Sequence, residues 1–380
     1  MNSVLSCGVC PSLGQSNAKN EMAYIQAVAS LVEEKSEFDD PTGAMQGSAM
    51  NDTKQVIIFG ATGSIGTKLA EILSVEHPGW SILAATRDVS KESALTQMDL
   101  PNVELIQVDV FSKENVVDAC KSCDIIFCCI GLHKYQRKYW AKYWPVVVDN
   151  LLAAAGSTHK LVICDNLYAY GPGMKISPDT KLIPASLKSK PGIRAELRRM
   201  IQEHMDRYPG TVTVIGASDF FGPQVTDKFI LGNSFIGKII KNETPMAWGS
   251  CSALHDFCYA PDLARALATA AVQERAFDRF WVCPHSVHGK TMQAIANDVA
   301  GKCDRSAPIK VKVIGKLVCR MLSPFSRSAA EMVELMPFWT NNYTVDDSQF
   351  IKEFGLKATN YDEALQETVD FFEQNEKYSI

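Results

Sequence analysis

The sequence lacks the features of several large protein classes. It has no run of about 18 apolar residues, the length that a helix needs to cross a bilayer, so we expect no transmembrane segment. Basic residues are not in surplus: 38 Lys and Arg against 43 Asp and Glu give a net charge of −5, which argues against nucleic acid or an anionic membrane as the partner of the whole surface. The 46% of hydrophobic and 21% of charged residues among 380 are typical of a globular protein with one large domain or two.

The twelve cysteines are not spaced as a disulfide framework. Cys128 and Cys129 are adjacent inside an apolar run, and Cys164 ends another, which is typical of small buried hydrophobic side chains. Two other pairs have the spacing of zinc ligands but are isolated and lack a nearby histidine, so we expect no metal and a reducing compartment. These pairs are Cys7 with Cys10 and Cys120 with Cys123.

The first 53 residues are interpreted as an extension and a linker before the main domain. Residues 1–20 contain four Ser, one Lys and no acidic residue, as transit peptides do, but they also lack Arg. We therefore expect a cytoplasmic protein, with organelle targeting by residues 1–20 as the alternative. Residues 21–36 carry apolar residues at helical spacing and predict an accessory helix, and residues 37–53 are polar and predict the linker.

From residue 54 onward, short apolar segments alternate with amphipathic helices. Continuous apolar strands in such an alternation predict an α/β fold, a Rossmann-like doubly wound parallel sheet with helices on both faces. The alternation ends near residue 222, and residues 223–380 predict a smaller α+β region with elements that return to the core. The predicted strands are 56–59, 82–85, 103–108, 124–129, 160–164 and 211–215, and the predicted helices include 65–73, 138–155 and 193–206.

A glycine-rich turn follows the first predicted strand and opens the first helix. In Gly60-Ala-Thr-Gly63-Ser-Ile-Gly66, the first glycine permits the tight turn, the second admits a diphosphate to the backbone, and the third lets the helix pack on the sheet. The N-terminus of the helix then offers free N–H groups to phosphates. The candidate cofactor-binding residues of this turn are Gly60, Thr62, Gly63, Ser64, Ile65 and Gly66.

This glycine spacing resembles the short-chain dehydrogenase/reductase superfamily, and later motifs are similar to its extended branch, the NAD-dependent epimerase/dehydratase family. The resemblance covers residues 54 to about 375 and implies an NAD(P)-binding domain at 54–222 and a mainly substrate-binding region at 223–380. Asp109-Val110 matches the family's adenine-contacting position, and Gly131 lies where the fourth strand lines the cofactor. The stretch from His255 to Asp262 is similar to the family's downstream Arg-Asp-Phe motif.

The choice between NADP and NAD is made at the end of the second strand. There the sequence has Thr86-Arg87-Asp88. Arg87 can bind the 2′-phosphate of NADP through its planar guanidinium, which favours NADP. Asp88 leaves NAD as the alternative cofactor, because a carboxylate at this position binds the ribose hydroxyls of NAD. In that case Arg87 would stack on the adenine.

The catalytic positions of the family are altered in this chain. The family has a Ser or Thr after the fifth strand and a Tyr-x-x-x-Lys motif further on, whose Tyr is the general acid/base. Alignment on Tyr170-Gly171 puts Asn166 at the Ser/Thr, Lys190 at the Tyr and Arg194 at the Lys. Asn166 can donate a hydrogen bond to a substrate carbonyl, and Arg194 can bind ribose or phosphate.

The sequence alone therefore does not identify the residue that donates the proton. Lys190 can exchange protons if it is desolvated, and Tyr168 and Tyr170 are alternative donors. Both tyrosines are equally well explained as packing residues beneath the turn.

Two segments are similar to an atypical subgroup of the family. These are Asp165-Asn-Leu-Tyr-Ala-Tyr-Gly-Pro172 and Ala217-Ser-Asp-Phe-Phe-Gly-Pro223. The subgroup usually carries Arg just before Ala-Ser-Asp, where this chain has Gly216.

Together, the motifs favour an oxidoreductase that exchanges hydride between NADP, or NAD, and a small organic carbonyl, hydroxyl or enone, with epimerase or dehydratase chemistry as a variant. Loss of the Tyr–Lys pair favours conjugate reduction over ordinary alcohol dehydrogenation. The alternative is a non-catalytic NADP(H)-binding redox sensor or assembly factor. A monomer or a homodimer fits either hypothesis.

Overall fold

The centre of the fold is a parallel sheet of seven strands in the order β11-β7-β5-β4-β1-β2-β3. The computed structural model describes residues 53–91, 93–227, 229–303 and 305–376. Because the strand order reverses between β1 and β4, the sheet is doubly wound, as the sequence predicts. The strands are β1 (Gln55–Phe59), β2 (Ser81–Thr86), β3 (Val103–Gln107), β4 (Ile125–Cys128), β5 (Lys160–Asn166), β7 (Val212–Ala217) and β11 (Arg279–Val282).

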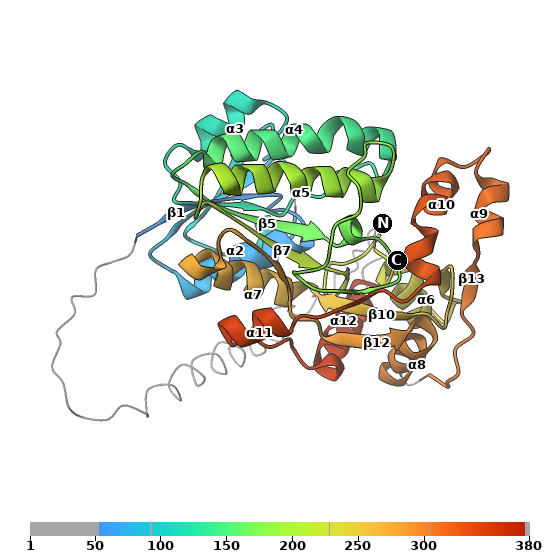
Figure 1. Cartoon of the computed structure of the whole chain (residues 1–380). Coiled ribbons are helices and arrows are strands. Elements are labelled where there is room, and N and C mark those ends of the chain that lie inside the picture. Colours follow the sequence, from blue (N-terminus) through green and yellow to red (C-terminus); the bar gives the residue numbers. More distant parts are fainter. Residues whose placement is uncertain (1–52, 92, 228, 304, 377–380) are drawn as a thin grey trace, which may run out of the picture. The chain divides into compact units, whose positions relative to one another are not determined.

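Helices cover both faces of this sheet (Figure 1). Alternate residues of β1 point to opposite faces: Val56 and Ile58 pack with one group of helices, and Ile57 and Phe59 with the other. Burial on both faces explains why the strands are continuously apolar. The first group contains α2 (Ser64–Glu76) and α7 (Ala260–Ala271), and the second contains α3 (Lys113–Cys120), α4 (Arg137–Ala155) and α5 (Lys190–Arg207).

The predicted fold class and the predicted strands and helices from residue 56 to 215 are confirmed. The accessory helix and the linker lie outside the described residues. One strand and one helix after residue 222 belong with the main sheet: β11 pairs with β7 as an edge strand, and α7 packs beside α2. The division at residue 222 stays a prediction.

The rest of the chain adds small sheets at the carboxyl end of the main sheet. Asp219 of β8 pairs with Phe257 of β10, which continues the β7 segment into the second region. The sheets are β12-β10-β8, β13-β9 and β14-β6, formed by β6 (Lys175–Ile176), β8 (Asp219–Phe221), β9 (Met246–Trp248), β10 (Leu254–Tyr259), β12 (Val287–Thr291), β13 (Lys312–Ile314) and β14 (Thr344–Val345). The helices are α6 (Lys238–Ile240), α8 (Met292–Lys302), α9 (Lys316–Leu322), α10 (Arg327–Thr340), α11 (Ser348–Phe354) and α12 (Tyr361–Glu376).

The ten cysteines in the described part of the chain are free. Burial raises the pKa of Cys120 to about 12 and that of Cys123 to about 11, so both remain thiols at neutral pH. Within the same residues, no three His, Cys, Asp or Glu side chains are placed to hold a metal ion. Cys7 and Cys10 lie outside the described residues.

No helix in the described ranges combines the length and apolar character needed to span a membrane.

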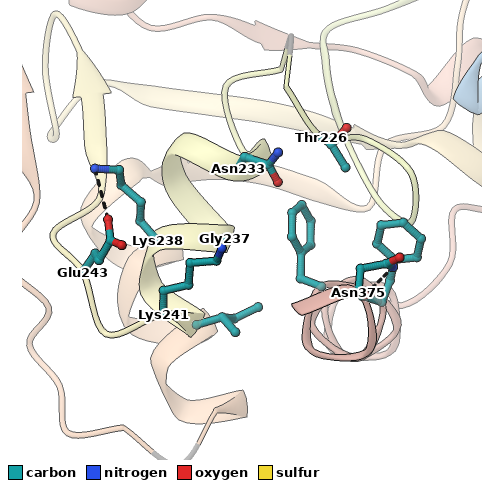
Figure 2. Close-up of a pocket in the computed structure, with 10 residues that line it drawn as sticks. Thr226, Asn233, Gly237, Lys238, Lys241, Glu243 and Asn375 are labelled. Atoms are coloured by element: carbon teal, nitrogen blue, oxygen red, sulfur yellow. Dashed lines mark hydrogen bonds and ion pairs between the residues drawn. The ribbon is translucent and has the colours of Figure 1, made fainter. Parts of the chain in front are cut away.

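A cavity of about 450 Å³ lies between the α6 segment and α12 (Figure 2). Two of its polar lining groups are already paired: Lys238 lies 3.5 Å from Glu243, and the amide of Asn233 donates to Asp227 at 2.5 Å. None of the residues predicted to bind cofactor or substrate lines it. We therefore assign no chemistry to this cavity.

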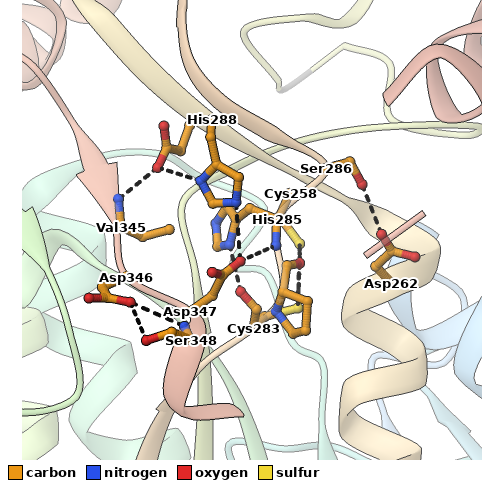
Figure 3. Close-up of polar contacts among 12 residues, drawn as sticks. Cys258, Asp262, Cys283, His285, Ser286, His288, Val345, Asp346, Asp347 and Ser348 are labelled. Carbon is orange, nitrogen blue, oxygen red and sulfur yellow. Dashed lines mark hydrogen bonds and ion pairs between the residues drawn. The ribbon is translucent and has the colours of Figure 1, made fainter. Parts of the chain in front are cut away.

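A polar network joins β10, β12 and the segment at β14 (Figure 3). His288 donates from Nδ1 to Asp256 at 3.1 Å, and its Nε2 lies 3.3 Å from Asp347. Asp256 also accepts from the backbone N–H of Gly289 and Val345. The hydrogen bonds that His288 donates to the two carboxylates raise its pKa to about 10, so this side chain is a cation that holds three strands together.

We expect this cation to make folding stability depend on pH. The pKa of His288 is raised from 6.5 to about 10, so its contribution is fully present below pH 6.5 and is lost as the pH rises through about 10. Urea unfolding of wild type and His288→Gln across this range should show a stability difference that shrinks as the pH rises. A difference that stays constant with pH would show that His288 is not charged. His159→Gln is the surface control.

Candidate functional site

The candidate site lies where the strand order reverses. After β1 the chain continues to β2 on one side, and after β4 it continues to β5 on the other side. Open α/β sheets bind ligands in the crevice outside the carboxyl ends of two such strands. The backbone N–H of Cys129 donates to the carbonyl of Phe59 at 2.8 Å, so the two strand ends are held together. The glycine turn starts at Gly60, directly after β1, and Gly131 follows β4.

The tight turn between β1 and α2 requires glycine at two positions. Gly60 has a φ of +83°, and a Cβ atom there would lie 2.7 Å from the carbonyl oxygen of Cys129. A Cβ on Gly66 would lie 2.3 Å from the carbonyl oxygen of Gly60. Since both clashes are with backbone atoms, no neighbouring side chain can move aside. The first turn of α2 is thus held directly against the end of β1.

The N-terminus of α2 has the properties of an anion site. Gly63 is the N-cap and provides no capping side chain, and the first turn contains no acidic residue. The first N–H groups of a helix have no partner within it and carry its positive dipole end. Thr62 is exposed and Ser64 half-buried, so their hydroxyls lie near the same surface, whereas Ile65 packs into the core. These residues fit a dinucleotide diphosphate.

The ends of β2 and β3 lie beside this turn. Arg87 is exposed, and no ion pair links it to a described residue. The Asp88 carboxylate accepts from the backbone N–H and the hydroxyl of Ser90, and the hydroxyl bond is the larger cause that lowers the pKa of Asp88. Asp109 is exposed and accepts from the N–H of Phe111 at 3.0 Å, which leaves its second oxygen available.

Val110 is buried, and its carbonyl accepts from the side chain of Asn150 on α4 at 2.9 Å. This bond fixes the loop that carries Asp109.

At the end of β5, Asn166 and Tyr168 are oriented by one local bond. The side-chain oxygen of Asn166 accepts from the backbone N–H of Tyr168 at 3.1 Å, which leaves the amide N–H₂ of Asn166 as a donor. The hydroxyl of Tyr168 accepts from the hydroxyl of Tyr135 at 2.9 Å. The ring of Tyr168 packs against Phe338 of α10, with 4.9 Å between the ring centroids.

The two residues that the sequence alignment puts at the family's Tyr-x-x-x-Lys positions are both engaged in ion pairs. Ser189 caps α5 by accepting from Gly192 at 3.0 Å, so Lys190 is the first residue of the helix. Lys190 is fully buried, and its Nζ lies 2.5 Å from Glu331. Arg194 lies 3.1 Å from Asp165 and stacks on Trp144.

Tyr170 is buried and packs near the sheet edge. Its ring centroid lies 5.3 Å from that of Phe280 on β11. The same phenylalanine occupies the space beside Gly216, where a Cβ would lie 2.5 Å from the ring. The arginine that the subgroup carries at this position would need Phe280 to move.

The sequence hypotheses did not include Asp219 and Tyr343 as candidate catalytic residues. Asn166 pairs with Ala217, so Asp219 follows β7 at the edge where Tyr168 follows β5. Burial raises the pKa of Asp219 to about 7. Tyr343 is 2% exposed, and its hydroxyl has no hydrogen-bond partner among the described residues. Burial, and then the charge of Asp219, raise the pKa of Tyr343 well above its usual value, so the two groups are neighbours.

Comparisons with known proteins agree with this arrangement. Residues 52–141 match the model of the NmrA-like family. A search of curated protein sequences found no match.

Among solved structures, dTDP-glucose 4,6-dehydratase from Bacillus anthracis, in complex with NAD, superimposes with a TM-score of 0.69 at 14% identity over 86% of this chain and 98% of that one. UDP-glucuronic acid 4-epimerase from Bacillus cereus, also with NAD, gives 0.67 at 13% identity over 84% and 99%. UDP-glucose 4-epimerase from Thermotoga maritima gives 0.66 at 14% identity over 84% and 99%. The chain therefore has the fold of the NAD-dependent epimerases and dehydratases that its motifs resemble, while the match to the NmrA-like model is limited to residues 52–141, from β1 to the start of α4.

Proposed function

We propose that the protein is an NAD(P)-dependent oxidoreductase that acts on a small organic carbonyl, hydroxyl or enone substrate. The observation that carries this proposal is the backbone contact between Gly60 and Gly66, which brings the N-terminus of α2 to the crevice at the strand-order reversal. The dehydratase and the epimerase that superimpose on this chain, at 14% and 13% sequence identity, were both solved with NAD bound, which supports a dinucleotide here.

The residues that would hold the dinucleotide follow from their placement. The amides of residues 62 and 64–66 would bind the diphosphate, because the N–H of Gly63 already donates to the carbonyl of Gly60 at 3.1 Å. Asp109 with Val110 would bind the adenine, and Gly131 would leave the nicotinamide end open, since a Cβ there meets no atom within 4 Å. Arg87 is exposed while the Asp88 carboxylate is bound to its own turn, so NADP is the preferred form. When bound, the nicotinamide supplies or accepts a hydride.

Asp219 is the group that would exchange the proton. With a pKa of about 7 it is both protonated and ionised near neutral pH, which suits a general acid/base. The free N–H₂ of Asn166 would hold the substrate oxygen, and the hydroxyls of Tyr168 and Tyr343 would orient the carboxyl group. Lys190 is matched by Glu331, so we assign it to positioning α10 and not to proton transfer.

A second candidate function is a non-catalytic redox sensor or assembly factor that binds NADP(H). The observation in its favour is that Lys190 and Arg194, which the alignment puts at the family's catalytic pair, are both held in ion pairs. Tight cofactor binding without turnover, over a broad panel of aldehydes, ketones and enones, would favour this function.

The first prediction concerns the glycine turn. Gly66→Ala introduces a Cβ at 2.3 Å from a backbone oxygen, so α2 must move away from β1. We expect at least about tenfold weaker NADPH binding by calorimetry, equivalent to about 1.4 kcal/mol. Gly79→Ala is the matched control, because a Cβ there meets no atom within 4 Å. Unchanged affinity in a Gly66→Ala protein with wild-type circular dichroism would refute the assignment of this turn.

The second prediction concerns cofactor choice. Arg87→Ala removes a charged donor to the 2′-phosphate, so NADPH binding should weaken about tenfold while NADH binding changes little. Asp88→Ala tests the alternative. If that variant loses NADH affinity and Arg87→Ala affects both cofactors equally, the protein uses NAD.

The third prediction concerns Asp219. Once a reducible compound is found in the panel, kcat/KM for NADPH-dependent reduction should fall as the pH rises through about 7, because the protonated carboxyl is the donor. Asp219→Asn keeps the volume but not the proton, so we expect a rate about a hundredfold lower without the pH step. NADPH binding should persist.

Asp179→Asn, on an exposed carboxylate, is the control. A wild-type pH profile retained by Asp219→Asn would move the proton donor to another residue.

A further inference from the structure

The surface formed by residues 310–327 has an unusual combination of side chains. It contains β13, α9 and the start of α10, and α9 and α10 lie at the right-hand edge of the molecule in Figure 1. Cys319 is the one buried residue of α9. The other residues of the helix are exposed, which leaves its apolar side chains without a core to pack against.

The apolar side chains of this surface are large and strongly exposed. Leu317 is 71% exposed, Met321 64% and Phe325 90%. Leu317 and Met321 are spaced by four on α9, so they share a face of the helix, and Phe325 lies in the turn that follows it. Val318 and Leu322 extend the same face and are 45% and 49% exposed. Single exposed apolar residues are common, but a cluster of this kind marks an interaction surface.

Basic residues surround this apolar face. From Arg305 to Ala330 the sequence contains no acidic residue, although the whole chain has a net charge of −5. Five exposed basic side chains in this stretch form no ion pair with a described residue. They are Lys310, Lys312, Lys316, Arg320 and Arg327.

We propose that residues 310–327 dock the protein on an anionic lipid surface. Short amphipathic segments with Lys and Arg beside Leu and Phe lie in the headgroup region of such membranes, with the apolar side chains inserted and the cations on the lipid phosphates. A second copy of this chain is disfavoured as the occupant, because the five basic side chains of one copy would face the same five basic side chains of the other. Nucleic acid would pair with the cations but would leave Leu317, Met321 and Phe325 in water.

Docking here would set the candidate site beside the membrane interface. Helix α10 begins at Arg327 in the docking surface, and its Glu331 and Phe338 contact Lys190 and Tyr168 of the candidate site. One helix therefore links the two. The docking proposal does not depend on catalysis and is tested by binding alone.

The test is flotation of the full chain with lipid vesicles. We expect the protein to float with vesicles of phosphatidylcholine mixed with phosphatidylserine and to stay behind with phosphatidylcholine alone. Lys316→Glu/Arg320→Glu should weaken binding at least about tenfold, since each basic residue near an anionic surface contributes about a factor of five. Phe325→Ser/Leu317→Ser should also weaken binding, while circular dichroism stays unchanged because these side chains are exposed.

Matched controls lie on other faces of the molecule. Lys352→Glu reverses an exposed charge on α11, and Val75→Ser removes a 62% exposed apolar side chain from α2. Both variants should bind vesicles like wild type.

Three outcomes would overturn the proposal. One is no flotation with the phosphatidylserine vesicles. Another is flotation that the α9 variants and the controls affect equally, which would place lipid binding elsewhere in the chain. The third is a wild-type dimer in sedimentation that Phe325→Ser/Leu317→Ser converts to monomer, without vesicle binding by either protein, which would make the surface an interface between copies.

Discussion

The close approach of helix α2 to the end of strand β1 is the constraint on which the candidate site depends. Only hydrogen fits between the α carbon of Gly66 and the carbonyl oxygen of Gly60, and the same is true where Gly60 meets Cys129. Because these contacts involve backbone on both sides, they fix the free N–H groups of the helix relative to the sheet. The neighbours of β1 in the sheet, β2 and β4, end on either side of this candidate anion site.

The chain shares the fold of its structural relatives, but its side chains differ from the family motif at the expected catalytic positions. The sequence alignment puts Lys190 and Arg194 at the positions of the family's acid/base pair, and in the structure Lys190 pairs with the half-buried Glu331 and Arg194 with the buried Asp165. Removing one partner of such a pair leaves an uncompensated charge, which costs about 3–5 kcal/mol, so these residues stabilise α5 and α10. Asp219 is the carboxyl whose pKa burial brings to about 7, and we infer that proton exchange has moved to it.

The sequence predicted the fold well because its signals are local. Strands buried on both faces are continuously apolar, as at residues 56–59, and the glycine spacing of 60–66, between a strand and a helix, specifies the tight turn. The candidate proton donor was not predictable, because its environment comes from distant segments: Asp219, Tyr168 and Tyr343 meet only in the folded chain. The same holds for Lys190, whose partner Glu331 is 141 residues away. The edge strand β11 is short, and its role depends on pairing with β7.

The measurement that tests the account most directly is calorimetric titration of the folded full chain with NADPH and with NADH. The account predicts saturable binding of one dinucleotide per chain, tighter for NADPH, and competition by the adenosine diphosphate portion alone, since the amides of the turn bind the diphosphate. Absence of heat and of competition with both dinucleotides, in protein whose circular dichroism shows the α/β fold, would contradict it.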